Sequence, residues 1–457
     1  TMHRFWIFNH YATTPLTGPL LRHYYFAEYL KERNIETTVF AANELHQTGG
    51  CVDTHGKPYL RTEEEGVPFV FVKTSKYQGN GLSRVKNMIS FFTGLMRISR
   101  KYAKEYGKPD VIMGSSAHPL TSIAGILIAR RFHVPAIVEV RDLWPEAIFS
   151  VGKVKMNSLP GRLLSAGEKW MYVHADAIVF TKEGDVDHIK EMGWDTAHGG
   201  KIDLKKCHYV NNGVKLSDYY ESIKKNVLDD PDLTSDTFKV VYTGTVRPVN
   251  NVGNLLDTAK LLKDKKDIQF LIFGGGSELE KLQQRVKNEH IDNVIFKGFV
   301  EKKYIPYILS RSSVNVLNYS QSNYNWSRGN SSNKLFEYMA SGKPIISTVK
   351  MGYCILDKYQ CGLSLEECTP QALAEQRAEA LIDAEQQVHL FSSSMNSSPV
   401  MVSFSSRKCA SRCRASILFC RMPMAFSCAV LTVAITSSSI FAAVSAEQAS
   451  AVSPDKY

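Results

Sequence analysis

The chain has 457 residues, with 55 Lys and Arg against 45 Asp and Glu, which gives a formal charge of +10. This length suits two or three domains, and the 44% hydrophobic and 22% charged fractions exclude a disordered or fibrous protein. The basic residues are spread along the chain without a long run, which argues against a nucleic-acid-binding arm.

Residues 1–205 alternate short apolar runs with amphipathic patterns. The apolar runs predict strands over Phe5–Asn9, Glu36–Ala41, Val67–Val72, Asp110–Gly114, Ala136–Val140 and Ala177–Phe180. The amphipathic patterns predict helices over Leu20–Arg33, Val85–Tyr106, Leu120–Arg131, Leu159–His174 and Glu183–Met192. Such alternation indicates a parallel sheet that is covered by helices on both faces.

A polar, turn-rich segment over residues 206–237 is predicted to be a linker, and the alternation restarts over residues 238–375. The second set of strands is Phe238–Thr243, Ile268–Phe273, Val294–Phe299, Val314–Asn318 and Lys343–Thr348. The second set of helices is Leu255–Lys263, Glu278–Asn288, Tyr304–Ser310 and Lys334–Ala340. We therefore expect an α/β protein of two Rossmann-like, doubly wound domains that face each other across a ligand-binding cleft.

Residues 376–457 differ in composition from the rest. They contain none of the 29 Gly, but 17 Ser and four of the nine Cys. Our hypothesis is that an out-of-frame or antisense reading follows Glu375; a genuine disordered tail and a membrane anchor are the alternatives. The segment Met422–Ala446 has no charge and is long enough to span a bilayer, but its Ser and Thr content disfavours insertion.

The remaining cysteines are scattered and form no CxxC pair, so we expect neither a disulfide framework nor a zinc cluster, as in a reducing cytosol. The first residues show no secretory signal pattern. These features predict a cytoplasmic protein.

In the second half, the segment from Asn330 to Pro344 carries the strongest signal. Ser332 or Asn333 can cap a helix whose free N–H groups form an anion site. Glu337, near the first turn, can accept two hydrogen bonds from ribose hydroxyls. The alternative is an ordinary capped helix with a surface Glu.

Upstream, Arg247 follows a strand end and Gly244, and can clamp a diphosphate or be a solvated loop residue. The run around Gly275 is weaker, since it can serve only to make a turn.

In the first half, polar residues follow three predicted strands. Gly18 lets backbone approach a phosphate or sugar, and His118 is expected at the cleft edge, although a structural His is common at such a place. The run Glu139–Glu146 (EVRDLWPE) leads directly out of a buried strand. Its charged groups need a partner or a ligand, and Arg141 paired with Asp142 or Glu146 is the alternative.

Together these segments resemble glycosyltransferase family 4, which has the GT-B fold. The segments that carry the resemblance are SSAHPLT (115–121), EVRDLWPE (139–146), VNNGV (210–214), YTGTVR (242–247), FGGGSE (273–278), KGFV (297–300) and NKLFEYMASGKP (333–344). The Arg-Asp-Leu-Trp-Pro-Glu run is similar to the subgroup that builds O-antigen and capsule repeats, often with UDP-linked N-acetylamino sugars.

The resemblance implies retaining transfer of a sugar from a UDP-sugar without a metal or other cofactor. It implies catalytic roles for His118, Asp142 and Glu337, and acceptor-binding or structural roles for Arg141 and Glu146. The implied donor-binding residues are Gly18, Arg247, Asn251, Gly275, Asn333, Lys334 and Glu337.

The sequence departs from the family pattern at three positions in the domains. The first of two glutamates spaced eight apart is replaced by Gly329, and the Lys expected after Arg247 is absent, so that Asn251 or Lys334 is left to replace it. The glycine loop near the N-terminus is reduced to Gly18.

The predicted function is therefore transfer to a lipid-linked saccharide, with an undecaprenyl-diphosphate-linked acceptor, at the inner face of the plasma membrane. The basic charge favours such peripheral membrane contact over nucleic acid. A UDP-N-acetylglucosamine 2-epimerase-like enzyme and a truncated, non-catalytic transferase remain alternatives.

Overall fold

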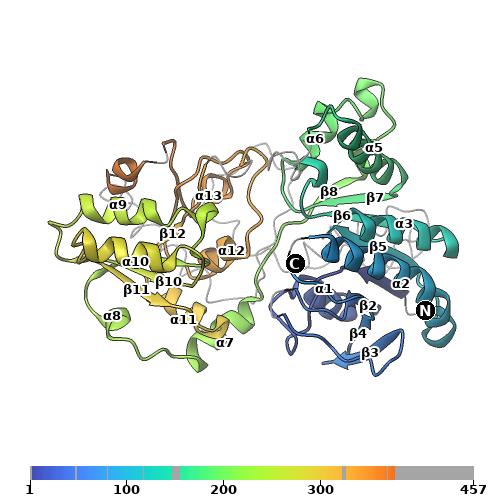
Figure 1. Ribbon diagram of the computed structural model, residues 1–457, viewed down its shortest axis with the longest axis horizontal. Helices are drawn as coiled ribbons and strands as arrows, with labels where there is room; N and C mark the ends of the chain where they lie inside the picture. The colour runs from blue at the N-terminus through green and yellow to red at the C-terminus, as the bar shows by residue number, and fades with distance from the viewer. Residues whose placement is uncertain are drawn as a thin grey trace, which may run out of the picture.

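The computed structural model describes residues 3–46, 49–79, 81–116, 118–146, 155–321, 326–367 and 369–375. The Ser- and Cys-rich segment 376–457, with the apolar run Met422–Ala446, lies outside these residues. The described chain forms two α/β domains that lie side by side, one blue to green and the other yellow to orange in Figure 1.

The first domain is built on an eight-stranded sheet of order β3-β4-β2-β1-β5-β6-β7-β8, parallel except for β3 against β4. Its strands are β1 (His3–Phe8), β2 (Ile35–Ala42), β3 (Tyr59–Glu64), β4 (Val67–Val72), β5 (Val111–Ser116), β6 (Ala136–Val140), β7 (Ala177–Phe180) and β8 (Cys207–Tyr209). Its helices are α1 (Arg22–Lys31), α2 (Leu82–Tyr106), α3 (Pro119–Phe132), α5 (Leu159–His174) and α6 (Asp185–Glu191), with short 3-10 turns η1 (Thr196–His198) and η2 (Leu204–Lys206).

The second domain has a parallel six-stranded sheet of order β11-β10-β9-β12-β13-β14. Its strands are β9 (Phe238–Thr243), β10 (Ile268–Phe273), β11 (Val294–Gly298), β12 (Val314–Leu317), β13 (Ile345–Ser347) and β14 (Gly362–Ser364). Its helices are α8 (Pro231–Thr234), α9 (Gly253–Leu261), α10 (Leu279–Asn288), α11 (Ile305–Ser310), α12 (Asn333–Ala340) and α13 (Ile355–Tyr359), with η3 (Pro248–Asn250) and η4 (Lys302–Tyr304). Helix α7 (Leu216–Lys225) follows the crossover between the domains.

Both sheets are buried on two faces because alternate residues of their central strands enter opposite cores. In β1, Trp6 and Phe8 pack on one face, while Phe5 and Ile7 pack on the other. Trp6 anchors the first core with edge-on contacts to aromatic rings of α2 and α3. The same alternation divides β9 and β10 of the second domain between two clusters. The prediction of two Rossmann-like domains is confirmed.

Two expectations about the boundaries differ from the structure. Residues 206–237 were expected to be a linker, but β8 pairs in parallel with β7 and extends the first sheet to Tyr209. The same segment also contains α7 and α8. Strand β3 was also not predicted, because its sequence YLRTEE is largely polar. This strand lies at the edge of the sheet, where it pairs with β4. A three-residue strand and a half-exposed edge strand both lack the apolar run that marks buried strands.

Glycines bring the first two loops of the second domain into contact. Gly274 has φ +143°, and a Cβ at this position would overlap the carbonyl oxygen of Gly244. Gly275, the next residue, has open space where its Cβ would be. The close approach of the loops after β9 and β10 therefore requires glycine at 274 but not at 275.

We predict that Gly274→Ala lowers the stability of the second domain by about 1–3 kcal/mol, because the backbone is strained and the loops are forced apart. Gly275→Ala is the matched control and should unfold as the wild type does. Denaturant unfolding of both variants measures the difference, and equal midpoints would contradict the assigned loop contact.

Candidate active site

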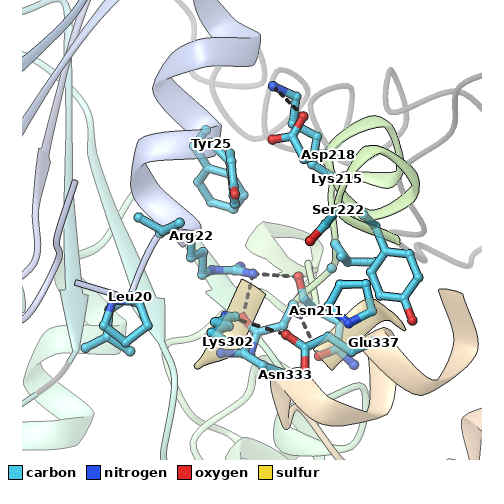
Figure 2. A pocket seen from close by; sticks show the side chains of 18 of the residues that line it. Leu20, Arg22, Tyr25, Asn211, Lys215, Asp218, Ser222, Lys302, Asn333 and Glu337 are labelled. Carbon is cyan, nitrogen blue, oxygen red and sulfur yellow. Dashed lines mark hydrogen bonds and ion pairs between the residues drawn. The ribbon is translucent and has the colours of Figure 1, made fainter. Parts of the chain in front are cut away.

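Two adjoining cavities lie between the domains. The strand-side cavity, of about 270 Å³, is lined by Pro19, Leu20, Thr243, Gly244, Lys302, Ile305, Asn333, Lys334 and Glu337. The linker-side cavity, of about 240 Å³, shares five of these residues and extends past Arg22, Tyr25, Arg141, Asn211, Lys215 and Tyr219 (Figure 2). Segments from both domains therefore enclose one continuous site.

Glu337 lies where the two cavities meet. It is the fifth residue of α12 and therefore lies in the second turn of the helix. The sequence predicts a position near the first turn instead. Its side chain is 17% exposed, and Oε1 lies 3.5 Å from Lys302 Nζ. Figure 2 shows this pair at the centre of the site. A partly exposed carboxylate at such a junction can accept hydrogen bonds from ligand hydroxyls.

The start of α12 is shaped by Asn330. Its Oδ1 accepts a 2.8 Å hydrogen bond from the backbone N–H of Ser332. Ser332 occupies the N-cap position, but its side chain makes no capping bond, and Asn333 is the first helical residue. The predicted side-chain cap is therefore wrong, although Asn333 lines both cavities as expected of a ligand-binding residue.

Lys334 is the buried cation of the strand-side cavity. Its Nζ lies 4.1 Å from the ring centroid of Tyr319 and 4.8 Å from that of Tyr242. The nitrogen is inaccessible to solvent and has no hydrogen-bond partner among the described residues. Burial, with a smaller effect of Arg247, lowers the pKa of Lys334 to about 7. The amine is therefore available to neutralise an anion that enters the cavity.

The other predicted donor-binding residues do not line the strand-side cavity. Arg247 is exposed, and its Nε donates to Asn250 Oδ1 at 3.3 Å. Asn251 adopts a left-handed backbone conformation with φ +47°, and Gly275 is open on its Cβ side. Gly18 precedes Pro19, which lines both cavities. The structure thus brings Asn333, Lys334 and Glu337 together at the cavities, but does not bring the other predicted donor-binding residues there.

His118 occupies the N-cap position of α3 and is only 1% exposed. Its Nε2 lies 2.7 Å from His10 Nδ1. Burial, with a smaller contribution from Arg84, lowers the pKa of His118 to about 3. The residue is a neutral, buried imidazole and does not line either cavity.

The charged run after β6 divides between two environments. Arg141 lines the linker-side cavity. The Asp142 side chain is 57% exposed and lies 3.7 Å from Lys182 Nζ, whereas Glu146 lies 3.9 Å from His188 Nδ1. Asp142 and Glu146 thus face Lys182 and His188 of the β7–α6 region, and only Arg141 of the three lines a cavity.

Sequence reasoning assigned no role to Glu139, although this residue organises the site. The Glu139 side chain is fully buried; it accepts from Arg22 Nε at 2.9 Å and from Ser115 Oγ at 2.6 Å, and lies 2.7 Å from His23 Nε2. Burial alone would raise the pKa of Glu139, but Arg22 and His23 outweigh it and hold the pKa well below its usual range. The sequence feature that could have identified this residue is a single charged Glu inside the otherwise apolar strand AIVEV.

Arg22 connects Glu139 to the second domain. Its Nη1 donates to the carbonyl oxygen of Asn211 at 2.6 Å and to Asn212 Oδ1 at 3.1 Å. The amides of Asn211 and Asn212 donate in turn to the carbonyl oxygens of Asn330 and Ser331. Because these carbonyls directly precede α12, the chain of contacts links the carboxyl edge of the first sheet to the helix that carries Glu337.

A second bridge joins α6 to the loop before α12. Arg328 forms a two-pronged pair with Glu191, with distances of 3.0 and 2.6 Å, and its carbonyl accepts from Gly184 N–H. Gly329, which replaces the first family glutamate, has φ +101°. A side chain would be strained in this conformation. The backbone of the loop therefore favours glycine over the glutamate of the family pattern at this position.

Other site types find no support in the described chain. Within the described ranges, no group of three or more His, Cys, Asp or Glu is placed to hold a metal ion. The cysteines at 51, 207, 354 and 361, which lie within these ranges, form no disulfide. No helix in this part of the chain combines the length and apolar character needed to cross a membrane.

Two family models match the chain, one for each domain. The model described as "Glycosyl transferase 4-like domain" matches residues 17–198, and the model described as "Glycosyl transferases group 1" matches residues 224–393. The chain belongs to the GT-B glycosyltransferases. The second match extends beyond Glu375, where a junction was expected, into residues that lie outside the described ranges.

The structural neighbours of this glycosyltransferase share its fold at low sequence identity. HepE of Anabaena in complex with UDP is 13% identical, with a TM-score of 0.56 over 85% of this chain and 92% of that chain. Sucrose-phosphate synthase of Thermosynechococcus elongatus is 15% identical, with a TM-score of 0.57 over 84% of this chain and 90% of that one. These likenesses confirm the GT-B fold.

Among curated proteins, the chain is similar to TuaH of Bacillus subtilis, named as a candidate glycosyltransferase of teichuronic acid biosynthesis. The two are 26% identical over 218 residues, which is 46% of this chain and 50% of TuaH. The match thus spans about half the length of that relative.

We predict that Glu139→Gln destabilises the first domain by about 3–5 kcal/mol, because it leaves Arg22 as an uncompensated buried charge. Glu36→Gln removes a half-exposed pair with Arg4 and is the control, with an expected loss below about 1 kcal/mol. Denaturant unfolding compares the two, and equal losses would contradict the proposed importance of the buried pair.

The same pair predicts a pH dependence. Since the folded state lowers the pKa of Glu139 below its usual 4.5, the stabilisation is present above that pH and is lost as the pH falls. Thermal midpoints of the wild type and Glu139→Gln should therefore converge in acid. A difference that stays constant down to pH 3 would contradict this sign.

Proposed function

We propose that this protein is a retaining glycosyltransferase that moves a sugar, an N-acetylamino sugar by resemblance, from a UDP-sugar to a lipid-linked saccharide in cell-surface polysaccharide biosynthesis. The observation that carries the proposal is the strand-side cavity, where Glu337, Lys334 and Gly244 meet. Support comes from HepE, which binds UDP and UDP-glucose, and from WaaG, a glycosyltransferase involved in lipopolysaccharide biosynthesis, at 12% identity and a TM-score of 0.53 over 84% of this chain and 94% of that one.

In this proposal, Glu337 holds the donor ribose. Among the described residues, its carboxylate pairs only with the exposed Lys302 at 3.5 Å, a contact that two ribose hydroxyls can replace with charge-assisted hydrogen bonds. A ribose at Glu337 puts the diphosphate beside the first turn of α12 and Lys334.

The charge that develops on the leaving diphosphate is met by groups of the chain itself. Lys334 supplies a buried amine, Arg247 a guanidinium near enough to Lys334 to lower its pKa, and α12 its free N–H groups. Lys334 thus replaces the lysine that the family pattern places after Arg247. His118 and Asp142 remain proposed catalytic residues of the first domain, with Arg141 on the acceptor side.

The acceptor side also carries the case for peripheral membrane contact. Most of the large apolar residues that are strongly exposed lie on segments that begin at the carboxyl edge of the first sheet: Leu16, Leu82, Val85, Ile89, Met156, Leu159, Leu163 and Leu164. Exposed Lys86, Lys155 and Arg162 lie among them. Apolar and basic side chains on one edge suit an anionic lipid surface that presents a lipid-diphosphate acceptor.

We predict that Glu337→Ala weakens binding of UDP-N-acetylglucosamine by tenfold or more. The reason is that a hydrogen bond to a charged group contributes about 1.5–3 kcal/mol to the binding free energy. Glu280→Ala, on the exposed side of α10, is the control and should bind as the wild type does. Calorimetric titration measures both. If the Glu337 variant binds normally, the ribose role is wrong.

We predict that donor binding depends on pH through Lys334. Since its pKa is about 7 in the empty cavity and a bound diphosphate favours the charged amine, affinity for a UDP-sugar should be highest below pH 7 and fall towards pH 9. Lys334→Met should bind weakly and without this slope. Lys343→Met, outside both cavities, should retain it; a slope that survives in Lys334→Met would contradict the assignment.

Turnover distinguishes the proposal from the alternatives. A transferase needs an acceptor and releases UDP with retention at the anomeric carbon, which NMR of the product detects. An epimerase converts the donor when no acceptor is present, and a non-catalytic chain binds UDP without either reaction.

For membrane contact, we predict that Leu159→Ser with Leu163→Ser lowers the fraction of protein that sediments with phosphatidylglycerol-containing vesicles. The two leucines are 84% and 74% exposed, so the folded state should not change. Leu261→Ser, an exposed leucine of the second domain, is the control. Unchanged sedimentation of the double variant would contradict this surface.

A further inference from the structure

The start of α2 presents two different faces at the carboxyl edge of the first sheet. Leu82, Val85 and Ile89 are 87%, 49% and 49% exposed, and their spacing of three and four residues puts them on one face of the helix. We call these three residues the α2 stripe. Arg84 does not share their spacing, and its Nε donates to the hydroxyl of Tyr11 at 3.1 Å. An apolar stripe and an arginine therefore occupy the same turns of α2.

Arg84 is held by a stack of aromatic rings from three neighbouring loops. Its guanidinium carbon lies 5.5 Å from the ring centroid of Tyr11, which follows β1. Tyr11 stacks on His46, after β2, with ring centroids 4.5 Å apart, and His46 Nδ1 lies 2.7 Å from the hydroxyl of Tyr77, after β4. Tyr11, Tyr77 and Arg84 are half-buried and His46 is exposed. The stack thus holds the arginine within reach of solvent.

The charge of Arg84 produces a positive potential at this edge. Burial lowers the pKa of His10, His46 and His118, and Arg84 lowers all three further. No carboxylate of the described chain is among the main groups that shift these three pKa values. The first turn of α2 adds to the potential, because no described side chain caps its N–H groups. The place therefore favours an anion.

The position of Arg84 indicates what kind of anion this is. A ligand that contacts both Arg84 and the α2 stripe must join an anionic group to an apolar chain, which neither an inorganic anion nor a nucleotide does. Arg84 precedes Asn87 by three residues on α2, and Asn87 Oδ1 lies 2.7 Å from His10 Nε2 at the sheet edge. The arginine thus lies between the exposed stripe and the sheet edge. In a lipid-linked saccharide, the diphosphate lies in the same way between the lipid chain and the sugar.

We propose that Arg84, held by Tyr11, binds the diphosphate of the lipid-linked acceptor, while the α2 stripe contacts the first part of its lipid chain. The acceptor class rests on the proposed function, whereas the place of the diphosphate rests on the arginine and the stripe. A guanidinium suits this role because its planar fork binds phosphate oxygens in pairs. This site is separate from that of the donor diphosphate, which the proposed function assigns to Lys334 of the second domain.

Binding tests the site on the full chain with saturating UDP, which occupies the donor cavity. The probe is farnesyl diphosphate below its critical micelle concentration. Arg84→Met should weaken its binding in calorimetric titration by about tenfold or more, as expected for the loss of a charged hydrogen-bonding partner. Arg97→Met, at an exposed arginine about 20 Å further along α2, is the control and should bind as the wild type does. Equal affinities of Arg84→Met and the wild type, or no binding by the wild type, would overturn the proposal.

Two further probes separate the possible sources of the anion. Inorganic pyrophosphate should bind the wild type more weakly than farnesyl diphosphate does, and equal affinities would overturn the role of the α2 stripe. A soluble short-chain phosphatidylglycerol at the same concentration should not displace farnesyl diphosphate. Displacement would assign Arg84 to membrane headgroups and overturn its assignment to the acceptor.

Turnover tests the consequence for the acceptor. Arg84→Met should raise the KM of a lipid-diphosphate-linked saccharide by about tenfold and leave the KM of the UDP-sugar unchanged. A saccharide glycoside without a diphosphate should react equally with both proteins, which a damaged fold would not allow. An unchanged acceptor KM overturns the inference. If the wild type transfers sugar to neither acceptor but binds farnesyl diphosphate through Arg84, the proposed function is overturned and the anion site is supported.

Discussion

The buried carboxylate of Glu139 is the interaction on which the arrangement of the site depends. A charge without solvent is stable only when its partners are fixed, and Arg22, His23 and Ser115 supply them. The guanidinium of Arg22 that pairs with Glu139 also donates hydrogen bonds to Asn211 and Asn212 of the crossover segment. The position of α12 relative to the first sheet thus follows from where one buried charge finds its partners.

Both domains have the same constraint at their sheet edges. Parallel strands bring all their carboxyl ends to one side, and the loops that follow carry the polar residues. With the two edges facing each other, residues as far apart as Pro19 and Glu337 line the same cavity. The loops at Gly244 and Gly274 pack closely, and Gly244 lines the strand-side cavity.

Two departures from the family pattern lie beside other contacts in the structure. In our proposal Lys334, whose amine contacts the rings of Tyr242 and Tyr319, takes the place of the lysine missing after Arg247. The glutamate missing at Gly329 leaves a loop held instead by the Arg328–Glu191 pair.

The sequence by itself determined the two doubly wound domains, because strands such as β6 and β9 are apolar runs whose limits the periodicity marks. It also placed Lys334 at the start of a helix and Glu337 within the same helix. Only the tertiary structure decided which side chains meet: Arg22 and Glu139 are 117 positions apart, and His10 and His118 are 108 apart. Periodicity reports which face of an element is buried, whereas the partner of a buried polar group depends on how distant elements pack. Neither the Arg22–Glu139 pair nor the His10–His118 contact could therefore be inferred from local pattern.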